Sequence, residues 1–167
     1  MNKLRLLLQS KYRIIYLIIL SLLFVSPLWA EEFSGKVVGV SDGDTIKVMR
    51  LGRAERVRLY GIDCPENGQA FGNRAKQFTS QMVFGENVVV KTHGCDRYGR
   101  ILGDVFLPDG RSLNQELVKN GFAWLFRKYS NDEKLAKLEG EAKAAKVGLW
   151  ADPHAIQPWD YRKNFHR

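Results

Sequence analysis

Acidic and arginine side chains gather in three short stretches of this 167-residue chain. The stretches are "SDGDT" (41–45), "RVRLYGIDCPE" (56–66) and "DRYGR" (96–100). Carboxylates are hard oxygen ligands of the kind Ca²⁺ prefers, and a carboxylate can also deprotonate a water molecule. Arginines bind phosphate through paired N–H groups and neutralise developing negative charge. Together such groups could hydrolyse a phosphodiester bond with the help of a metal ion.

Each stretch also has an ordinary explanation. Asp42 and Asp44 flank a glycine, and Asp-Gly is common in turns that bind nothing. Arg58 lies within an apolar strand pattern, shortly before Asp63, and an arginine is rarely buried unless it is paired. The alternative is that Arg58 is exposed on an edge strand, on the same face as Arg56. "DRYGR" is equally compatible with a charged hairpin turn.

Strands must position these stretches. Alternating apolar residues over 33–66 predict three consecutive antiparallel strands separated by turns. Apolar spacing and turn signals then predict a helix at 69–85, strands at 87–93 and 100–110, and helices at 112–121 and 130–150. Ser112 and Ser130 are the expected N-caps of the last two helices. Five short strands with an intervening helix suit a small barrel of the OB-fold type, an α+β fold that is mainly β.

The first thirty residues have the pattern of a signal peptide. Basic residues precede the apolar run "IIYLIILSLLFV" (14–25), and the segment ends on the small residue Ala30. The run is shorter than the roughly 20 apolar residues of a membrane span, although an uncleaved N-terminal anchor stays open. We therefore expect an exported protein, periplasmic or secreted, with one domain over 31–167 and an irregular basic tail from about residue 151.

The charge is compatible with a polyanionic partner without requiring one. The chain has 26 Lys and Arg against 18 Asp and Glu, a net charge of +8. The predicted signal segment contains four of the basic and none of the acidic residues, which leaves 22 against 18 and a net charge of +4. A soluble basic domain without such a partner has comparable support.

The two cysteines leave two interpretations open. An even number of cysteines in an oxidising compartment favours a disulfide, whereas a reducing compartment favours free thiols. None of the three histidines stands at zinc-finger spacing from them.

Four stretches in order, "SDGDTIKV", "RVRLYGIDCPE", "DRYGR" and "LNQELVKNGFAW", resemble the staphylococcal nuclease (thermonuclease) family. The resemblance covers about residues 33–150. It implies an OB-fold barrel with three helices, a single Ca²⁺ site, and hydrolysis of DNA and RNA that leaves 3′-phosphate ends. It implies no stable protein partner, and we expect a monomer.

The resemblance also implies the ion's ligands. The carboxylates of Asp44 and Asp63 and the backbone carbonyl of Cys64 take the Ca²⁺ positions. The implied fold would bring Cys95 to the same mouth of the barrel as Cys64. We therefore expect a Cys64–Cys95 disulfide that ties the two loops together, with free thiols as the competing interpretation.

The catalytic positions match residue by residue. Glu66 would act on the attacking water, and Arg58 and Arg100 would bind the scissile phosphate. Tyr98 and Tyr129 match tyrosines that contact the bound nucleotide. The alternative function is a non-catalytic OB-fold module that binds nucleic acid or a protein. Such a module is expected to lack one of the acids or arginines, and this chain has all of them.

Overall fold

The structure is a computed structural model that describes residues 31–165. The predicted signal peptide lies outside the described residues. Within the described part, no helix is both long enough and apolar enough to cross a membrane.

Five strands close into a barrel, as predicted for the OB-fold. Their order around the barrel is β1-β2-β3-β6-β5, and β5 pairs with β1 to complete it. The pairing of β3 with β6 is parallel and the other pairings are antiparallel. The bounds are β1 Glu32–Asp42, β2 Thr45–Arg50, β3 Arg53–Leu59, β5 Asn87–Cys95 and β6 Ile101–Phe106.

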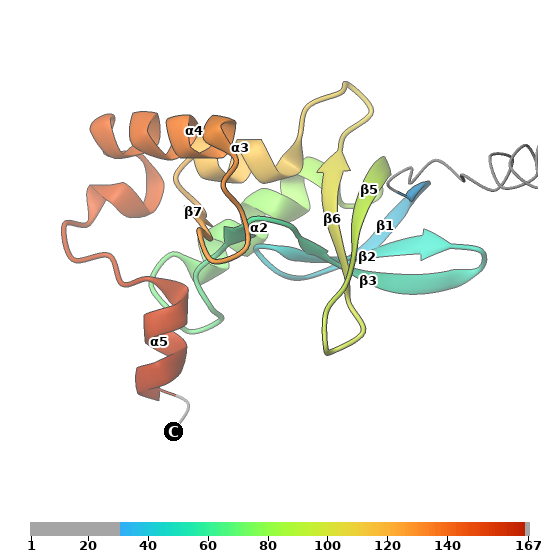
Figure 1. The fold of residues 1–167 in the computed structure, drawn as a ribbon, viewed down its shortest axis with the longest axis horizontal. Helices are drawn as coiled ribbons and strands as arrows, with labels where there is room; N and C mark the ends of the chain where they lie inside the picture. Colours follow the sequence, from blue (N-terminus) through green and yellow to red (C-terminus); the bar gives the residue numbers. More distant parts are fainter. Residues whose placement is uncertain (1–30, 166–167) are drawn as a thin grey trace, which may run out of the picture.

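Helices and a second, two-stranded sheet lie beside the barrel (Figure 1). The α-helices are α2 Gly72–Val83, α3 Leu113–Lys119, α4 Glu133–Ala144 and α5 Pro158–Phe165, and the 3₁₀ turn η1 spans Gly148–Ala151. The small sheet pairs β4, Ile62–Asp63, with β7, Trp124–Leu125. The described residues thus contain four α-helices where three were predicted, because part of the tail expected to be irregular is helical.

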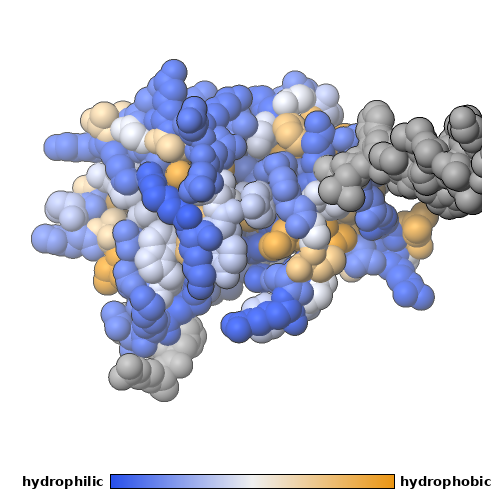
Figure 2. Space-filling view, in the orientation of Figure 1, coloured by the Kyte–Doolittle hydropathy of each residue, from blue (hydrophilic) through white to orange (hydrophobic). Residues whose placement is uncertain are grey.

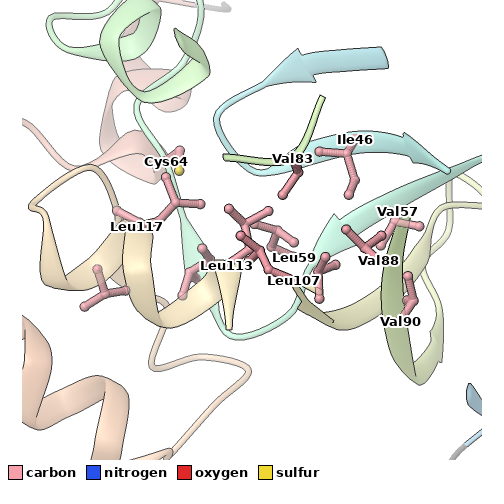
Figure 3. Packing of buried hydrophobic residues seen from close by; sticks show 14 of the residues in the cluster. Ile46, Val57, Leu59, Cys64, Val83, Val88, Val90, Leu107, Leu113 and Leu117 are labelled. Carbon is pink, nitrogen blue, oxygen red and sulfur yellow. The ribbon is translucent and has the colours of Figure 1, made fainter. Parts of the chain in front are cut away.

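The core fills the barrel and continues under α3. Strand alternation places Ile46, Val57 and Val88 inside, and the buried face of α3 contributes Leu113 and Leu117 (Figure 3). Outward positions are mostly polar, so hydrophilic side chains cover most of the face seen in Figure 2, with apolar side chains in small separate groups.

Two helix starts test the capping predictions. Ser112 caps α3 as predicted, because its side chain accepts a hydrogen bond from the N–H of Gln115. The prediction for Ser130 was wrong. Asp132 caps α4 instead, because its carboxylate accepts from the N–H groups of Lys134 and Leu135.

The last long helix is shorter than predicted. It ends at Ala144, and Lys146 takes a left-handed conformation with φ of 53°. A residue in that region stops the helical hydrogen-bond pattern, so the apolar residues that follow form η1 rather than a continuation of α4.

Candidate active site

The turn between β1 and β2 holds Asp44 in a buried position. Its carboxylate is 2% exposed, and its N–H donates to the Asp42 carboxylate at 3.2 Å. Gly43 is needed there because an added Cβ would lie 2.8 Å from the Cβ atoms of both Ala75 and Cys64. The Gly43 carbonyl accepts a hydrogen bond of 2.5 Å from Thr79 on α2. Packing against α2 therefore fixes the direction of Asp44.

Arg58 joins the Asp44 turn to β4. The carbonyl of Asp44 accepts from the N–H of Leu59 at 2.8 Å, which places Asp44 beside the end of β3. The Arg58 guanidinium contacts Asp44 Oδ1 through Nη1, and its Nη2 donates to Asp63 Oδ1 at 2.6 Å. Asp63 is fully buried, and its backbone pairs with Trp124 of β7. Arg58 is thus a paired, largely buried arginine and not an exposed one on a sheet edge.

The next residue, Cys64, completes this cluster through its backbone. Its N–H donates to Asp44 Oδ2 at 2.7 Å, and its side chain is 3% exposed within the core (Figure 3). The structure therefore brings together Asp44, Asp63 and Cys64, the three predicted ion ligands. Their role as ligands stays a prediction.

The available donors fit a hard divalent cation in their chemistry. Asp44 and Asp63 offer carboxylate oxygens and Cys64 offers a carbonyl, whereas the Cys64 sulfur is directed into the core. Arg58 already neutralises part of the charge on both carboxylates. Within residues 31–165, no three acidic, histidine or cysteine side chains form a complete metal cage. A bound ion would therefore take its other oxygens from water and substrate.

Glu66 lies in the loop after β4, next to Asp63. Its N–H donates to the Gln69 side chain at 3.0 Å, and its carboxylate contacts Arg162 of α5. Arg162 also donates from Nη2 to Asp63 Oδ2 at 2.7 Å. Burial on its own would lower the pKa of Arg162, but its hydrogen bonds to Asp63 and Glu66 outweigh this and raise the pKa above its ordinary value.

Arg100 lies in the turn between β5 and β6, apart from the Arg58 cluster. Its Nε donates to Asp96 Oδ2 at 2.7 Å. Burial raises the pKa of Asp96, but hydrogen bonds from Arg100 and Tyr98 outweigh it and leave the pKa lowered, so Asp96 is ionised and holds the arginine. Within the described residues, no hydrogen bond or ion pair joins Arg100 to Arg58 or Glu66. The link is through the sheet, because Arg100 precedes Ile101, which pairs with Val57 next to Arg58.

The two predicted nucleotide-binding tyrosines are exposed. Tyr98 is 59% exposed at the β5–β6 turn, with the Arg97 and Arg100 guanidinium groups over its ring. Tyr129 is 56% exposed after β7, and its ring packs edge-on against Phe126. Both rings are accessible to a ligand, but no described contact joins them to each other.

The predicted Cys64–Cys95 disulfide is not present, because the structure has both cysteines as free thiols. Cys64 is buried against Gly43 and Ala75, whereas Cys95 is exposed at the end of β5. The prediction failed because of the direction of the Cys64 side chain. The prediction used the position of the two loops, but the Cys64 side chain points into the core while its backbone faces the acidic cluster.

Thiol labelling should distinguish the two cysteines. Burial raises the pKa of the Cys64 thiol well above its ordinary value, so Cys64 stays protonated and unreactive at neutral pH. We expect a small thiol reagent to modify one cysteine, Cys95, in the folded protein and both after denaturation. A protein that takes up no reagent even after denaturation, and takes it up at both cysteines only after reduction, would contradict this and show that the disulfide forms.

Arg162 is a member of the site that the sequence analysis missed. A signal was available in "PWDYRKNF" (158–165): proline is favoured at the first position of a helix, with acids in the first turn and basic residues in the last. That pattern predicts the helix. The contact of Arg162 with Asp63 depends on how the tail folds back, which no local pattern specifies.

Comparisons with known proteins identify the family of the chain. Residues 56–152 match the family model described as "Staphylococcal nuclease homologue". The chain is 44% identical over 152 residues to Protein ParB of Escherichia coli, covering 85% of each chain. It is 41% identical over 147 residues to an uncharacterized endonuclease of Escherichia coli, covering 88% of this chain and 96% of the relative. It is 42% identical over 147 residues to a micrococcal nuclease of Shigella flexneri, covering 82% and 84%. With this barrel, this acidic cluster and these matches, the chain belongs to the staphylococcal nuclease family.

Proposed function

We propose that this member of the family is an endonuclease that cleaves DNA and RNA, uses Ca²⁺ as its cofactor and leaves 3′-phosphate ends. One observation carries the proposal. A single guanidinium, that of Arg58, joins two buried carboxylates, one from the β1–β2 turn and one from β4, and Arg162 joins Glu66 to the second of them. Buried carboxylates are costly unless they are paired or bind cations, so their convergence supports a site for chemistry on charged groups.

In the proposed reaction Glu66 is the general base. Its carboxylate accepts a proton from a water molecule as the water oxygen attacks phosphorus. The bond from phosphorus to the 5′-oxygen breaks, and that oxygen takes up a proton to leave as a hydroxyl. The products are a 3′-phosphate and a 5′-hydroxyl. Glu66 is 33% exposed, so water can reach it without a change of fold.

The two predicted arginines would stabilise the negative charge that develops on the phosphate oxygens. A guanidinium has five N–H donors, so Arg58 keeps donors for phosphate beyond those that hold Asp44 and Asp63. Arg100 uses Nε for Asp96, and the donors on its two terminal nitrogens would bind phosphate.

Asp44, Asp63 and the Cys64 carbonyl would hold the ion. When bound, Ca²⁺ would act as a Lewis acid that neutralises charge on the phosphate. The exposed rings of Tyr98 and Tyr129 are suited to stack on bases of either nucleic acid, which supports a substrate range that includes both DNA and RNA. Export, predicted from the first thirty residues, is part of the same proposal.

Cleavage with analysis of the product ends tests this function. Purified protein with Ca²⁺ should cut a closed circular DNA and a linear RNA, and the products should carry 3′-phosphates that a phosphatase removes. Cleavage of only DNA or only RNA would restrict the proposed substrate range to that nucleic acid. Products with 5′-phosphates would contradict the proposed bond cleavage. A folded protein that cuts neither with any divalent ion would overturn the function.

A further inference from the structure

The C-terminal segment packs against the loop that carries Glu66. The side chain of Gln69 accepts from the N–H of Glu66 at 3.0 Å and donates to the carbonyl of Ile156 at 2.6 Å. In the first turn of α5, the Trp159 ring stacks on Phe126 with centroids 5.2 Å apart and planes 7° from parallel. Figure 1 shows α5 beside this loop and away from the barrel strands. These contacts give α5 a defined position at the site.

From that position, α5 places one guanidinium on two carboxylates of the site. Arg162 Nη2 donates to Asp63 Oδ2 at 2.7 Å, Nη1 donates to Asp63 Oδ1 at 3.3 Å, and Nη1 also contacts Glu66 Oε1. Asp63 is fully buried, and the Arg162 side chain is 37% exposed. Arg162 pairs with the Glu66 carboxylate, which is 33% exposed.

We propose that Arg162 is a positioning residue of the active site, which holds the Glu66 carboxylate beside Asp63 in the direction needed to activate water. The inference rests on the proposed function. A glutamate side chain on a loop has three rotatable bonds, and a base that is misplaced by about 1 Å can cost about a hundredfold in rate. The planar Arg162 guanidinium contacts both carboxylates and so restricts rotation of the Glu66 side chain.

The shape of arginine matters for this role as well as its charge. A guanidinium donates from two nitrogens in a fixed plane, whereas a lysine ammonium is a point charge that cannot span Asp63 and Glu66 in the same way. The next residue, Lys163, provides a contrast. It is 73% exposed and pairs with Asp160 on its own helix.

Arg162 should also influence metal affinity. Three carboxylates, those of Asp44, Asp63 and Glu66, meet two guanidiniums, those of Arg58 and Arg162, so these five side chains carry one net negative charge. Removal of Arg162 makes the cluster more negative, and a cation should then bind more tightly. Charge therefore governs the effect on metal binding, and the two-nitrogen geometry governs the effect on rate.

Three variants of the full chain separate these effects. In Arg162→Gln, we expect kcat at saturating Ca²⁺ to fall by about tenfold or more with little change in KM, and Ca²⁺ measured by calorimetry to bind about three- to tenfold more tightly. Arg162→Lys keeps the charge but not the fork, so Ca²⁺ affinity should return to the wild-type value while kcat stays low. Lys163→Gln, which removes a solvent-exposed cation from the same helix, should match the wild type in both measurements.

The outcomes are distinct. A kcat for Arg162→Gln that is unchanged or higher than that of the wild type would overturn the proposal, and with tighter Ca²⁺ binding it would identify Arg162 as a competitor of the metal. Weaker Ca²⁺ binding in Arg162→Gln would also overturn it, because it would indicate general disturbance of the site. If the wild type cleaves no nucleic acid, the proposed function fails, and the calorimetric comparison still tests how Arg162 acts on the acidic cluster.

Discussion

Replacement of Glu66 by glutamine is expected to reduce kcat by about a hundredfold or more and to leave the protein folded. Glutamine has the same shape but accepts no proton at neutral pH, and a general base contributes about 10²- to 10⁴-fold to a rate. The side chain is partly exposed and contacts Arg162, so loss of its charge removes one ion pair and leaves the core unchanged. Cleavage rates at saturating Ca²⁺, with circular dichroism as the test of folding, measure the effect.

Glu86→Gln is the matched control for this variant. Glu86 is an exposed glutamate in the turn between α2 and β5, and its backbone carbonyl accepts from Val37 of β1. The Glu86→Gln substitution makes the same chemical change and should leave the cleavage rate unchanged. A Glu66→Gln protein that is folded and cleaves at the wild-type rate would remove Glu66 from the mechanism.

The second large effect is expected for Arg58→Ala, in stability as well as in activity. Arg58 is the shared partner of Asp44 and Asp63, which are 2% and 0% exposed. Removal of one partner from a buried ion pair leaves an uncompensated charge and typically costs about 3–5 kcal/mol. Because Arg162 still pairs with Asp63, we expect a loss near the lower end, about 3 kcal/mol, in the free energy of unfolding measured by urea denaturation with a chelator present.

Metal should partly rescue this variant. A divalent cation at the two carboxylates replaces the lost positive charge, so Ca²⁺ should raise the unfolding temperature of Arg58→Ala by more than that of the wild type. Arg53→Ala, an exposed arginine at the start of the same strand, is the control and should change stability by less than about 0.5 kcal/mol. Equal stability of Arg58→Ala and the wild type in chelator would show that Arg58 does not compensate the two carboxylates.

The barrel could be predicted from the sequence because its signals are local. Alternating apolar residues specify which face of each strand is buried, and the structure has strands where the alternation predicted them, including Thr45–Arg50 and Arg53–Leu59. The Ser112 cap was equally local and was confirmed. At the next helix the sequence rule favoured Ser130, whereas the structure has Asp132 as the N-cap.

The site could be predicted only where a turn or strand determines direction. Asp44 lies in the turn after β1, its carbonyl accepts from Leu59 at the end of β3, and the chain reaches Asp63 in β4 soon after Leu59, so their proximity follows from the chain path. The direction of the Cys64 side chain depends on the space beside Gly43, which the sequence does not describe. The contact of Arg162 depends on a fold-back of the tail over almost a hundred residues of separation, so only the tertiary structure reveals it.

The most direct test of the account is the rate at which the purified wild-type protein cleaves a labelled oligonucleotide in chelator and then with excess Ca²⁺. The proposed roles of Asp44 and Asp63 are to bind the cation and to pair with arginine. We therefore expect no cleavage above background in chelator and full recovery when Ca²⁺ is added in excess. An equal rate in chelator and in Ca²⁺ would contradict the assignment of these two carboxylates as a metal site.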